Sequence, residues 1–301
     1  MKSHYDYNRI DGFDQPMISV VIPVYNAERY LTEALESIRG QTFSRWECIC
    51  IDDGSTDASP DILDRFAEMD SRFKVVHQSN SGCQAARNKA LKMISAPWFL
   101  FMDVDDIYCS KAFETLLRIA EEYEVDVVES GYCRHEEELS CAGDVTVVED
   151  PIARMIHDAK FRGEPWGRIL RTSKFKHIQF VPGYHDDVKW VTSATMRMFN
   201  LAVVCAPMYF WRPVASSISN KPDYYKALPD LWKYQVKECP MLKHRLGVIA
   251  YSYFKIMPNI VSSHMLQTLR KNGVISFKWL SIRKRLRIFF NAIAMGEENE
   301  T

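Results

Sequence analysis

The sequence predicts an α/β fold: a mostly parallel central sheet with helices on both faces, followed by a C-terminal helical extension. Short apolar runs alternate with stretches in which apolar residues recur every three to four positions, the order expected of βα units. The first run, residues 18–24, is almost continuously apolar, as expected for a strand covered on both faces. Past residue 222 the pattern is helical throughout.

Each predicted element carries its own local signal. Leu31, Leu35 and Ile38 lie on one stripe of the first helix, and Asp57 and Ser110 are good N-cap residues for two later helices. We expect strands at 18–24, 46–51, 73–77, 98–102 and 125–128, and helices beginning near 27, 57, 84, 110 and 150.

Charge is distributed unevenly along the 301 residues. The formal net charge is −1, but residues 240–295 contain ten Lys/Arg and no acid, which leaves the remainder at −11. Within residues 277–295 the apolar side chains fall mostly on one helical face. We therefore expect this segment to bind a membrane surface. The alternative is a helix packed on the preceding domain; no nucleic acid is expected, because the tail lacks aromatic platforms.

The cysteines and the absence of apolar spans indicate the compartment. The eight cysteines form no metal-ligand or disulfide spacing, so we interpret them as reduced and mostly buried thiols. Neither a signal peptide nor an apolar run of membrane-spanning length is recognisable. These features predict a cytoplasmic protein that can lie on the inner face of the cell membrane.

Three carboxylates follow the apolar run 98–102: Asp103, Asp105 and Asp106. Like charges at this range raise one another's pKa unless a cation lies between them. Mg²⁺ and Mn²⁺ take oxygen ligands, few of them from protein, and leave positions for phosphates. The run thus predicts a metal-bridged diphosphate at a strand end, and a solvated acidic turn is the alternative.

Polar residues follow the other predicted strands as well. Ligands bind outside the carboxyl ends of strands in open α/β sheets, so these residues are expected to share one edge. A solvated-loop explanation would have to treat all four strand ends as coincidence. The residues concerned are Tyr25 and Asn26 after the first strand, Asp52 and Asp53 after the second, and Asn80, Arg87 and Asn88 after the third.

Four motifs together carry a family resemblance. They are I-S-V-V-I-P-V-Y-N at 18–26, I-D-D-G-S-T-D at 51–57, N-x-G-x-x-x-x-R-N at 80–88 and D-x-D-D at 103–106. The set resembles the family-2 glycosyltransferases, which are inverting enzymes with the GT-A fold. The similarity is close over residues 17–130 and looser over 165–220.

The looser part departs from the family pattern at two positions. The segment 166–170 resembles the W-x-K-L/I motif, with Arg168 where Lys is commoner. The segment 184–188 resembles the Glu-Asp motif that supplies the base, with Asp186 in place of Glu. Residues 209–219 resemble the strand that closes the donor site.

The resemblance implies a nucleotide-diphosphate sugar donor, most often a uridine one, with Mn²⁺ or Mg²⁺. Residue by residue it implies nucleotide contacts from Pro23, Tyr25, Asn26, Asp53, Asn80, Arg87 and Asp103, and metal contacts from Asp105, Asp103 and Asp106.

We expect Asp187, supported by Asp186, to be the catalytic base. A predicted helix starts there, and a neighbouring acid raises the proton affinity of the pair. Two capping acids are the alternative, and His185 is a weaker candidate base. Four residues are candidates for acceptor or sugar contacts, although the aromatic ones can equally belong to the core. They are Trp166, His185, Trp211 and Arg212.

The predicted function is sugar transfer to a saccharide or lipid-linked saccharide acceptor in cell-surface polysaccharide synthesis. The domains expected are a catalytic domain at 1–220, with a nucleotide-binding half (17–130) and an acceptor half (131–220), and the extension at 221–301. One alternative is a sugar-1-phosphate nucleotidyltransferase, which would need a Gly-rich basic loop after the first strand. Another is a non-catalytic nucleotide-sugar-binding subunit, which would not need a base.

Overall fold

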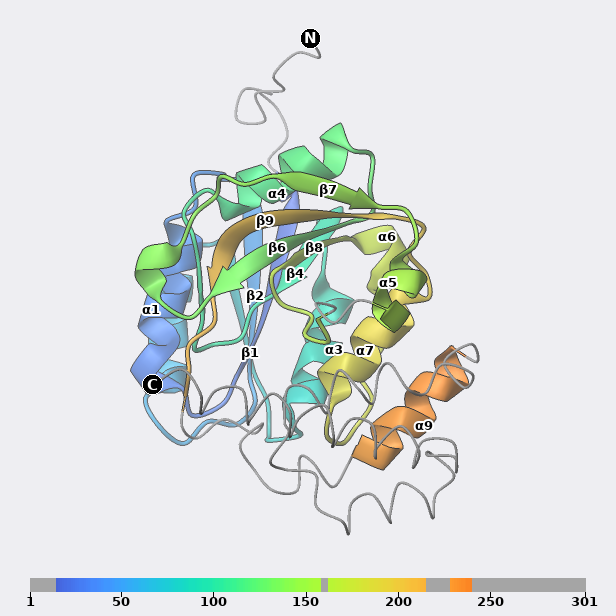
Figure 1. The fold of residues 1–301 in the computed structure, drawn as a ribbon. Coiled ribbons are helices and arrows are strands. Elements are labelled where there is room, and N and C mark those ends of the chain that lie inside the picture. The colour runs from blue at the N-terminus through green and yellow to red at the C-terminus, as the bar shows by residue number, and fades with distance from the viewer. Residues whose placement is uncertain (1–14, 158–161, 215–227, 240–301) are drawn as a thin grey trace, which may run out of the picture. The chain divides into compact units, whose positions relative to one another are not determined.

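The computed structural model describes residues 15–157, 162–214 and 228–239 (Figure 1). The chain divides into two compact units, and the strands named below all belong to the first. Helix α9 (Leu228–Glu238) belongs to the second. The amphipathic segment 277–295 lies outside the described residues, so its membrane contact stays a prediction.

The nucleotide-binding half follows the predicted βα order. Its strands β3-β2-β1-β4 lie side by side and run parallel. The elements are β1 (Ile18–Val24), α1 (Glu28–Arg39), β2 (Trp46–Asp52), α2 (Ser59–Met69), β3 (Phe73–His77), α3 (Cys83–Met93), β4 (Trp98–Phe101), β5 (Ile107–Tyr108) and α4 (Ala112–Glu122).

The α/β fold class is confirmed, and the other half makes the sheet mixed where a mostly parallel one was expected. Strand β8 is antiparallel to both β4 and β6, and β5 and β7 are antiparallel to β9. Local patterns do not reveal this arrangement, because its strands pair with partners far away in the sequence. Its elements are β6 (Val127–Cys133), η1 (Glu136–Glu138), β7 (Val145–Val148), α5 (Pro151–His157), β8 (Arg168–Arg171), α6 (Thr172–Phe175), α7 (Asp186–Thr195) and β9 (Leu201–Phe210).

Alternate residues of the central strands enter two cores, one on each face of the sheet. Val20 of β1 joins the core shared with α1, α2 and α4, whereas Val21 joins the core shared with α3 and α7. Helices α3 and α7 lie side by side on that second face (Figure 1). This packing sets the start of α7 beside the carboxyl end of β4, where the predicted acids lie.

One cysteine prediction is wrong: Cys109 and Cys141 form a disulfide across 32 residues. Both segments lie along β9, since Cys109 N donates to Met208 O and Ser140 N donates to Pro207 O, and this brings the sulfurs together. The spacing along the sequence carries no sign of it. Four of the other six cysteines are buried thiols, as expected. Among the described helices, none has the length and apolarity required to cross a membrane.

Candidate active site

The loops after β1 and β2 hold each other through reciprocal hydrogen bonds. Asp57 Oδ2 accepts from Glu28 N at 3.0 Å, and Glu28 Oε2 accepts from Ala58 N at 2.9 Å. The other oxygen of Asp57, Oδ1, accepts from Ser59 N at 2.9 Å. The N-cap position of α2 is thus Ala58, one residue after the expected Asp57. Asp57 nevertheless satisfies a backbone N–H at the start of α2 and another at the start of α1 across the sheet edge, which the sequence did not predict.

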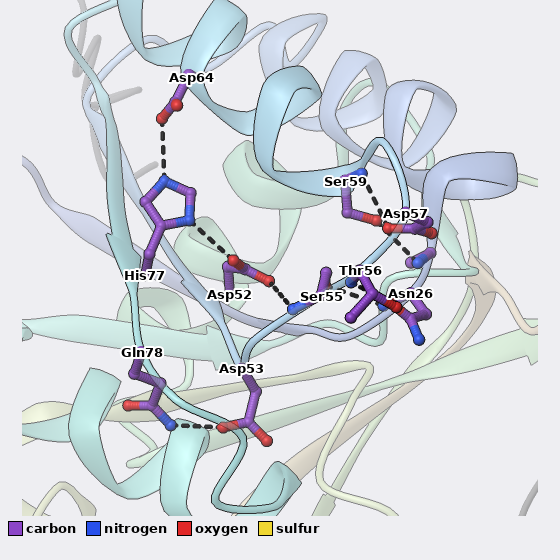
Figure 2. Close-up of polar contacts among 11 residues, drawn as sticks. Asn26, Asp52, Asp53, Ser55, Thr56, Asp57, Ser59, Asp64, His77 and Gln78 are labelled. Carbon is purple, nitrogen blue, oxygen red and sulfur yellow. Dashed lines mark hydrogen bonds and ion pairs between the residues drawn. The ribbon is translucent and has the colours of Figure 1, made fainter.

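Asn26 belongs to the same pair of loops (Figure 2). Its Oδ1 accepts from Thr56 N at 2.8 Å, and its backbone N donates to Ser55 Oγ at 3.0 Å. Asn26 was expected to contact a nucleotide, and its amide oxygen is engaged in holding the two loops together.

Asp53 shapes the loop that leads into α3. Its carboxylate is 3% exposed and accepts from Gln78 Nε2 at 2.7 Å, and from Ser81 N and Gly82 N at 2.8 Å each. Gly54 lies against the same loop with φ +75°, and a Cβ there would be 2.7 Å from the backbone N of residue 80. Three hydrogen bonds from the protein therefore already hold the Asp53 carboxylate in place, and any contact with a nucleoside would be additional to them.

The other expected nucleotide contacts lie at the same edge of the sheet. Tyr25 is 51% exposed at the end of β1, and Pro23 is half-buried beside it. Asn80 is exposed in the loop after β3, its backbone N close to Gly54. The end of β1 pairs with the end of β2, so these side chains come from adjoining loops.

A histidine that the sequence prediction missed joins this edge. His77 Nδ1 lies 2.8 Å from Asp52 Oδ2, and its Nε2 lies 3.1 Å from Asp64 Oδ1 (Figure 2). Hydrogen bonds to Asp52 and Asp64 raise the pKa of His77. The only sequence signal available is that His77 ends the strand beside β2, which puts it in register with Asp52.

The three acids after β4 occupy different environments. Asp106 is 1% exposed, and its two carboxylate oxygens accept from Tyr209 Oη at 2.6 Å and from Arg212 N at 2.9 Å. Burial, with the charges of Asp103 and Asp105, raises the pKa of Asp106 to about 9. Asp106 therefore ties the acidic loop to β9, and it is less open than the other two to an ion.

Asp103 and Asp105 fit a hard divalent cation better. Both are only partly buried, and burial together with the charge of Asp103 raises the pKa of Asp105 to about 6. A cation bound between the carboxylates of Asp103 and Asp105 would relieve this repulsion. Across the residues that the structure describes, no three His, Cys, Asp or Glu side chains group closely enough to hold a metal alone. Two carboxylates plus diphosphate oxygens suit Mg²⁺ or Mn²⁺.

Arg87 joins the acidic loop to Asp186, the neighbour of the expected base. Its Nη2 donates to Asp103 Oδ1 at 2.8 Å and its Nη1 to Asp186 Oδ2 at 3.2 Å. The side chain is 8% exposed, and its guanidinium lies over the ring of Phe180 at 5.1 Å. Two sequence-predicted motifs thus meet on one buried guanidinium. The expected phosphate contact by Arg87 would have to share it with these carboxylates.

Asp187 has the environment of a base that works near neutral pH. Burial is the largest cause that raises its pKa, to about 7, followed by the charges of Asp186 and Glu164. It lies in the first turn of α7, where its Oδ1 accepts from Val188 N at 2.8 Å. His185 precedes the helix in the left-handed conformation and is buried, so it is poorly exposed to an acceptor.

Two of the four expected acceptor residues, Trp166 and Trp211, lie in an aromatic cluster beside the acidic loop. Trp166 is 4% exposed and stacks on Tyr209 with centroids 4.6 Å apart, so it is a core aromatic. Trp211 stacks on Trp166 with centroids 6.3 Å apart. Tyr132, which the sequence prediction missed, packs edge-on against both tryptophans and is 42% exposed. Arg212 forms an ion pair with Glu33 of α1 at 2.6 Å, so the expected acceptor or sugar contact would have to share its guanidinium with this carboxylate.

Comparison with known proteins finds similarity to one family of enzymes. Residues 19–140 match the pattern described as glycosyl transferase family 2. The chain is 32% identical over 228 residues to the putative glycosyltransferase EpsH of Bacillus subtilis, an alignment that covers 71% of this chain and 65% of EpsH. The matched span thus falls just short of two thirds of that relative.

Solved structures share the fold. A fragment of S. aureus TarS, solved in complex with UDP-GlcNAc, superposes with a TM-score of 0.65 at 22% identity, covering 79% of this chain and 72% of the fragment. The mannosyltransferase PcManGT from Pyrobaculum calidifontis, solved in complex with GDP-Man and Mn²⁺, superposes with a TM-score of 0.55 at 15% identity, covering 93% and 81%. At these identities the likeness establishes a common architecture.

Proposed function

This chain belongs to glycosyl transferase family 2, and we propose that it transfers a sugar, with inversion, from a nucleotide-diphosphate donor to a saccharide or lipid-linked saccharide acceptor. We further propose a uridine donor, a divalent cation and a role in cell-surface polysaccharide synthesis. The observation that carries the proposal is the Arg87 bridge, because it joins the acids at the end of β4 to the acids at the start of α7. Neither acid pair alone would distinguish a transferase from a solvated loop.

The residues divide between the two sides of the reaction. Asp187 takes the proton from the acceptor hydroxyl. Its pKa, raised to about 7, gives the carboxylate a high proton affinity while a substantial fraction is still ionised near pH 7. Asp103 and Asp105 would hold the cation, which when bound neutralises charge on the departing diphosphate. Asp53 and its loop would line the nucleoside site, and Tyr25 is exposed at the edge of that site.

The proposals of a uridine donor and of a divalent cation draw on the solved neighbours and on one pair of carboxylates. TarS was solved with a uridine donor and PcManGT with a guanosine donor, so the shared fold accommodates both. The cation is supported by the Asp103–Asp105 pair and by PcManGT, which was solved with Mn²⁺. A non-catalytic binding subunit is disfavoured, since it would have no need of a half-buried acid such as Asp187, whose pKa is raised to about 7.

The test is a panel of nucleotide sugars assayed for nucleotide release and product formation with Mn²⁺ or Mg²⁺. Asp187→Asn should lower transfer by about 10³-fold and leave the donor Kd within about twofold, because only the base is lost. Asp105→Asn should weaken metal-dependent donor binding instead. Exposed Asp61→Asn on α2 is the control and should change neither quantity. Full turnover by Asp187→Asn would refute the base assignment, and the absence of donor binding across the panel would refute the proposed activity.

A further inference from the structure

One face of α3 contacts the whole segment that leads into the base. Gln84, Arg87 and Asn88 follow the i, i+3, i+4 spacing of neighbours on a helix. Gln84 Nε2 donates to Gly183 O at 3.3 Å, and Arg87 reaches Asp186. Asn88 contacts the earlier end of the same segment. The function proposed above uses Arg87 but gives no role to Asn88.

Asn88 pairs with the backbone of one residue through both ends of its amide. Its Nδ2 donates to Phe180 O at 2.9 Å, and its Oδ1 accepts from Phe180 N at 2.7 Å. This arrangement reproduces the pairing that a neighbouring strand would give. A partly buried amide that satisfies both groups of one residue fixes its position more strictly than a single hydrogen bond does.

Phe180 in turn contacts α7, so its position affects the position of that helix. Its ring is 2% exposed, stacks on Trp190 with centroids 5.4 Å apart and meets Phe101 of β4 edge-on at 5.3 Å. Trp190 Nε1 donates to Ile178 O at 2.9 Å, so the segment and the helix are joined twice. Trp190 lies three residues after Asp187, about one turn along the same helix.

We propose that Asn88 is a positioning residue for the base: its hydrogen bonds to Phe180 set the start of α7, and with it the Asp187 carboxylate, relative to the donor loops. This inference rests on the proposed function, because only that function makes Asp187 a base. The contacts that position α7 are present without substrate. Asp53 accepts from Ser81 N and Gly82 N at the entrance to α3, so one helix touches both the donor-side loop and the base segment.

The geometry makes the expected effect specific to turnover. A base displaced by about 1 Å costs roughly 10²-fold in rate, whereas donor contacts on other loops are unaffected. Asn88→Ala should therefore lower kcat by about 10- to 100-fold with donor Kd within about twofold. Asn88→Asp keeps the acceptor for Phe180 N but sets a carboxylate oxygen against Phe180 O, so its kcat should fall at least as far as that of Asn88→Ala.

Amide hydrogen exchange provides a readout that needs no activity. In Asn88→Ala, peptides spanning 178–190 should exchange faster, while those of β1 and β2 keep wild-type rates. Leu63→Ala on α2 is the matched control, since it removes a fully buried side chain from the core on the opposite face of the sheet. It should lower Tm at least as much as Asn88→Ala and preserve both kcat and exchange at 178–190.

The outcomes separate this inference from the proposed function. Wild-type exchange at 178–190 in Asn88→Ala would overturn the positioning role whatever the activity. If Asn88→Ala lowers kcat only as much as Leu63→Ala does, the positioning role would be overturned as well, because general destabilisation would then explain the loss of turnover. Wild-type protein that turns over no nucleotide sugar would overturn the proposed function, and the exchange result would still decide whether Asn88 positions α7.

Discussion

The donor-side loops and the base segment are held by different kinds of contact. On the donor side, residues 23–28 and 52–59 cap one another through backbone groups and short side chains. The base segment, 178–187, depends on side chains that reach it from α3 and β4. Arg87 joins the base segment to the donor side through a third loop, because it pairs with Asp186 and with Asp103 after β4.

This difference indicates how each region should respond to change. Loops that satisfy their own backbone groups lose a definite, modest amount of stability for each side chain removed. A segment held from outside can move as a body when one external contact is lost, and catalysis is sensitive to such movement. Donor binding and turnover should therefore separate in variants of the two regions.

Removal of Arg87 should have the largest effect, because it breaks the link between the regions. Arg87→Met leaves Asp103 and Asp186 without their buried cation, so the free energy of unfolding should fall by about 3 kcal/mol. Donor binding and turnover should both be lost. Arg118→Met breaks an exposed pair with Glu122 on α4 and should cost under about 0.5 kcal/mol. Equal losses from both variants in urea denaturation would contradict the bridging role.

The pH dependence of turnover sharpens the comparison on the base side. Burial and Asp186 raise the pKa of Asp187 to about 7, and the base must be ionised. We expect kcat at saturating donor to fall about tenfold per pH unit below about pH 7 and to level off above it. Donor Kd should change less over the same range. A kcat that stays constant from about pH 5.5 to about pH 8 would exclude Asp187 as the titrating base.

Loss of a reciprocal cap should have a smaller effect, confined to the donor side. Asp57→Ala removes the acceptor for the backbone N–H groups of Glu28 and Ser59, so the free energy of unfolding should fall by about 1 kcal/mol. Donor Kd should rise and kcat at saturation should stay near wild type, since α7 is not involved. Asp61→Ala, in the exposed first turn of α2, serves as the control. A kcat loss larger than the Kd change would show that the regions are not independent.

The smallest expected effect is a pH-dependent contribution from His77. Its folded-state pKa is raised by Asp52 and Asp64, so protonation stabilises the fold. This contribution is complete below the unfolded pKa of about 6.5 and is lost as pH rises through the higher folded value. Because the side chain is 42% exposed, we expect only a few tenths of a kcal/mol. Denaturation at about pH 6 and about pH 9 should show this difference in wild type and not in His77→Gln.

Most of the donor side could be predicted from the sequence. Apolar strands β1 to β4 and helices α1 to α4 each carry a local pattern, and the rule on strand ends placed Asp53 and Asp103 at one edge. The mixed half was not predictable in the same way. Strand β8 follows an insertion and pairs antiparallel with β4 and β6, and no local pattern specifies which edge a strand will join.

By itself the sequence determined the element order, the acids at the strand ends and the resemblance to the family-2 glycosyltransferases, because these depend on local spacing and side-chain chemistry. Only the tertiary structure decided how those acids are used. Asp106 turned inward to Tyr209, Asp57 capped a helix 29 residues away, and Arg87 took partners 16 and 99 residues away. Hydrogen-bond partners at such separations are selected by packing, which no single stretch of sequence encodes.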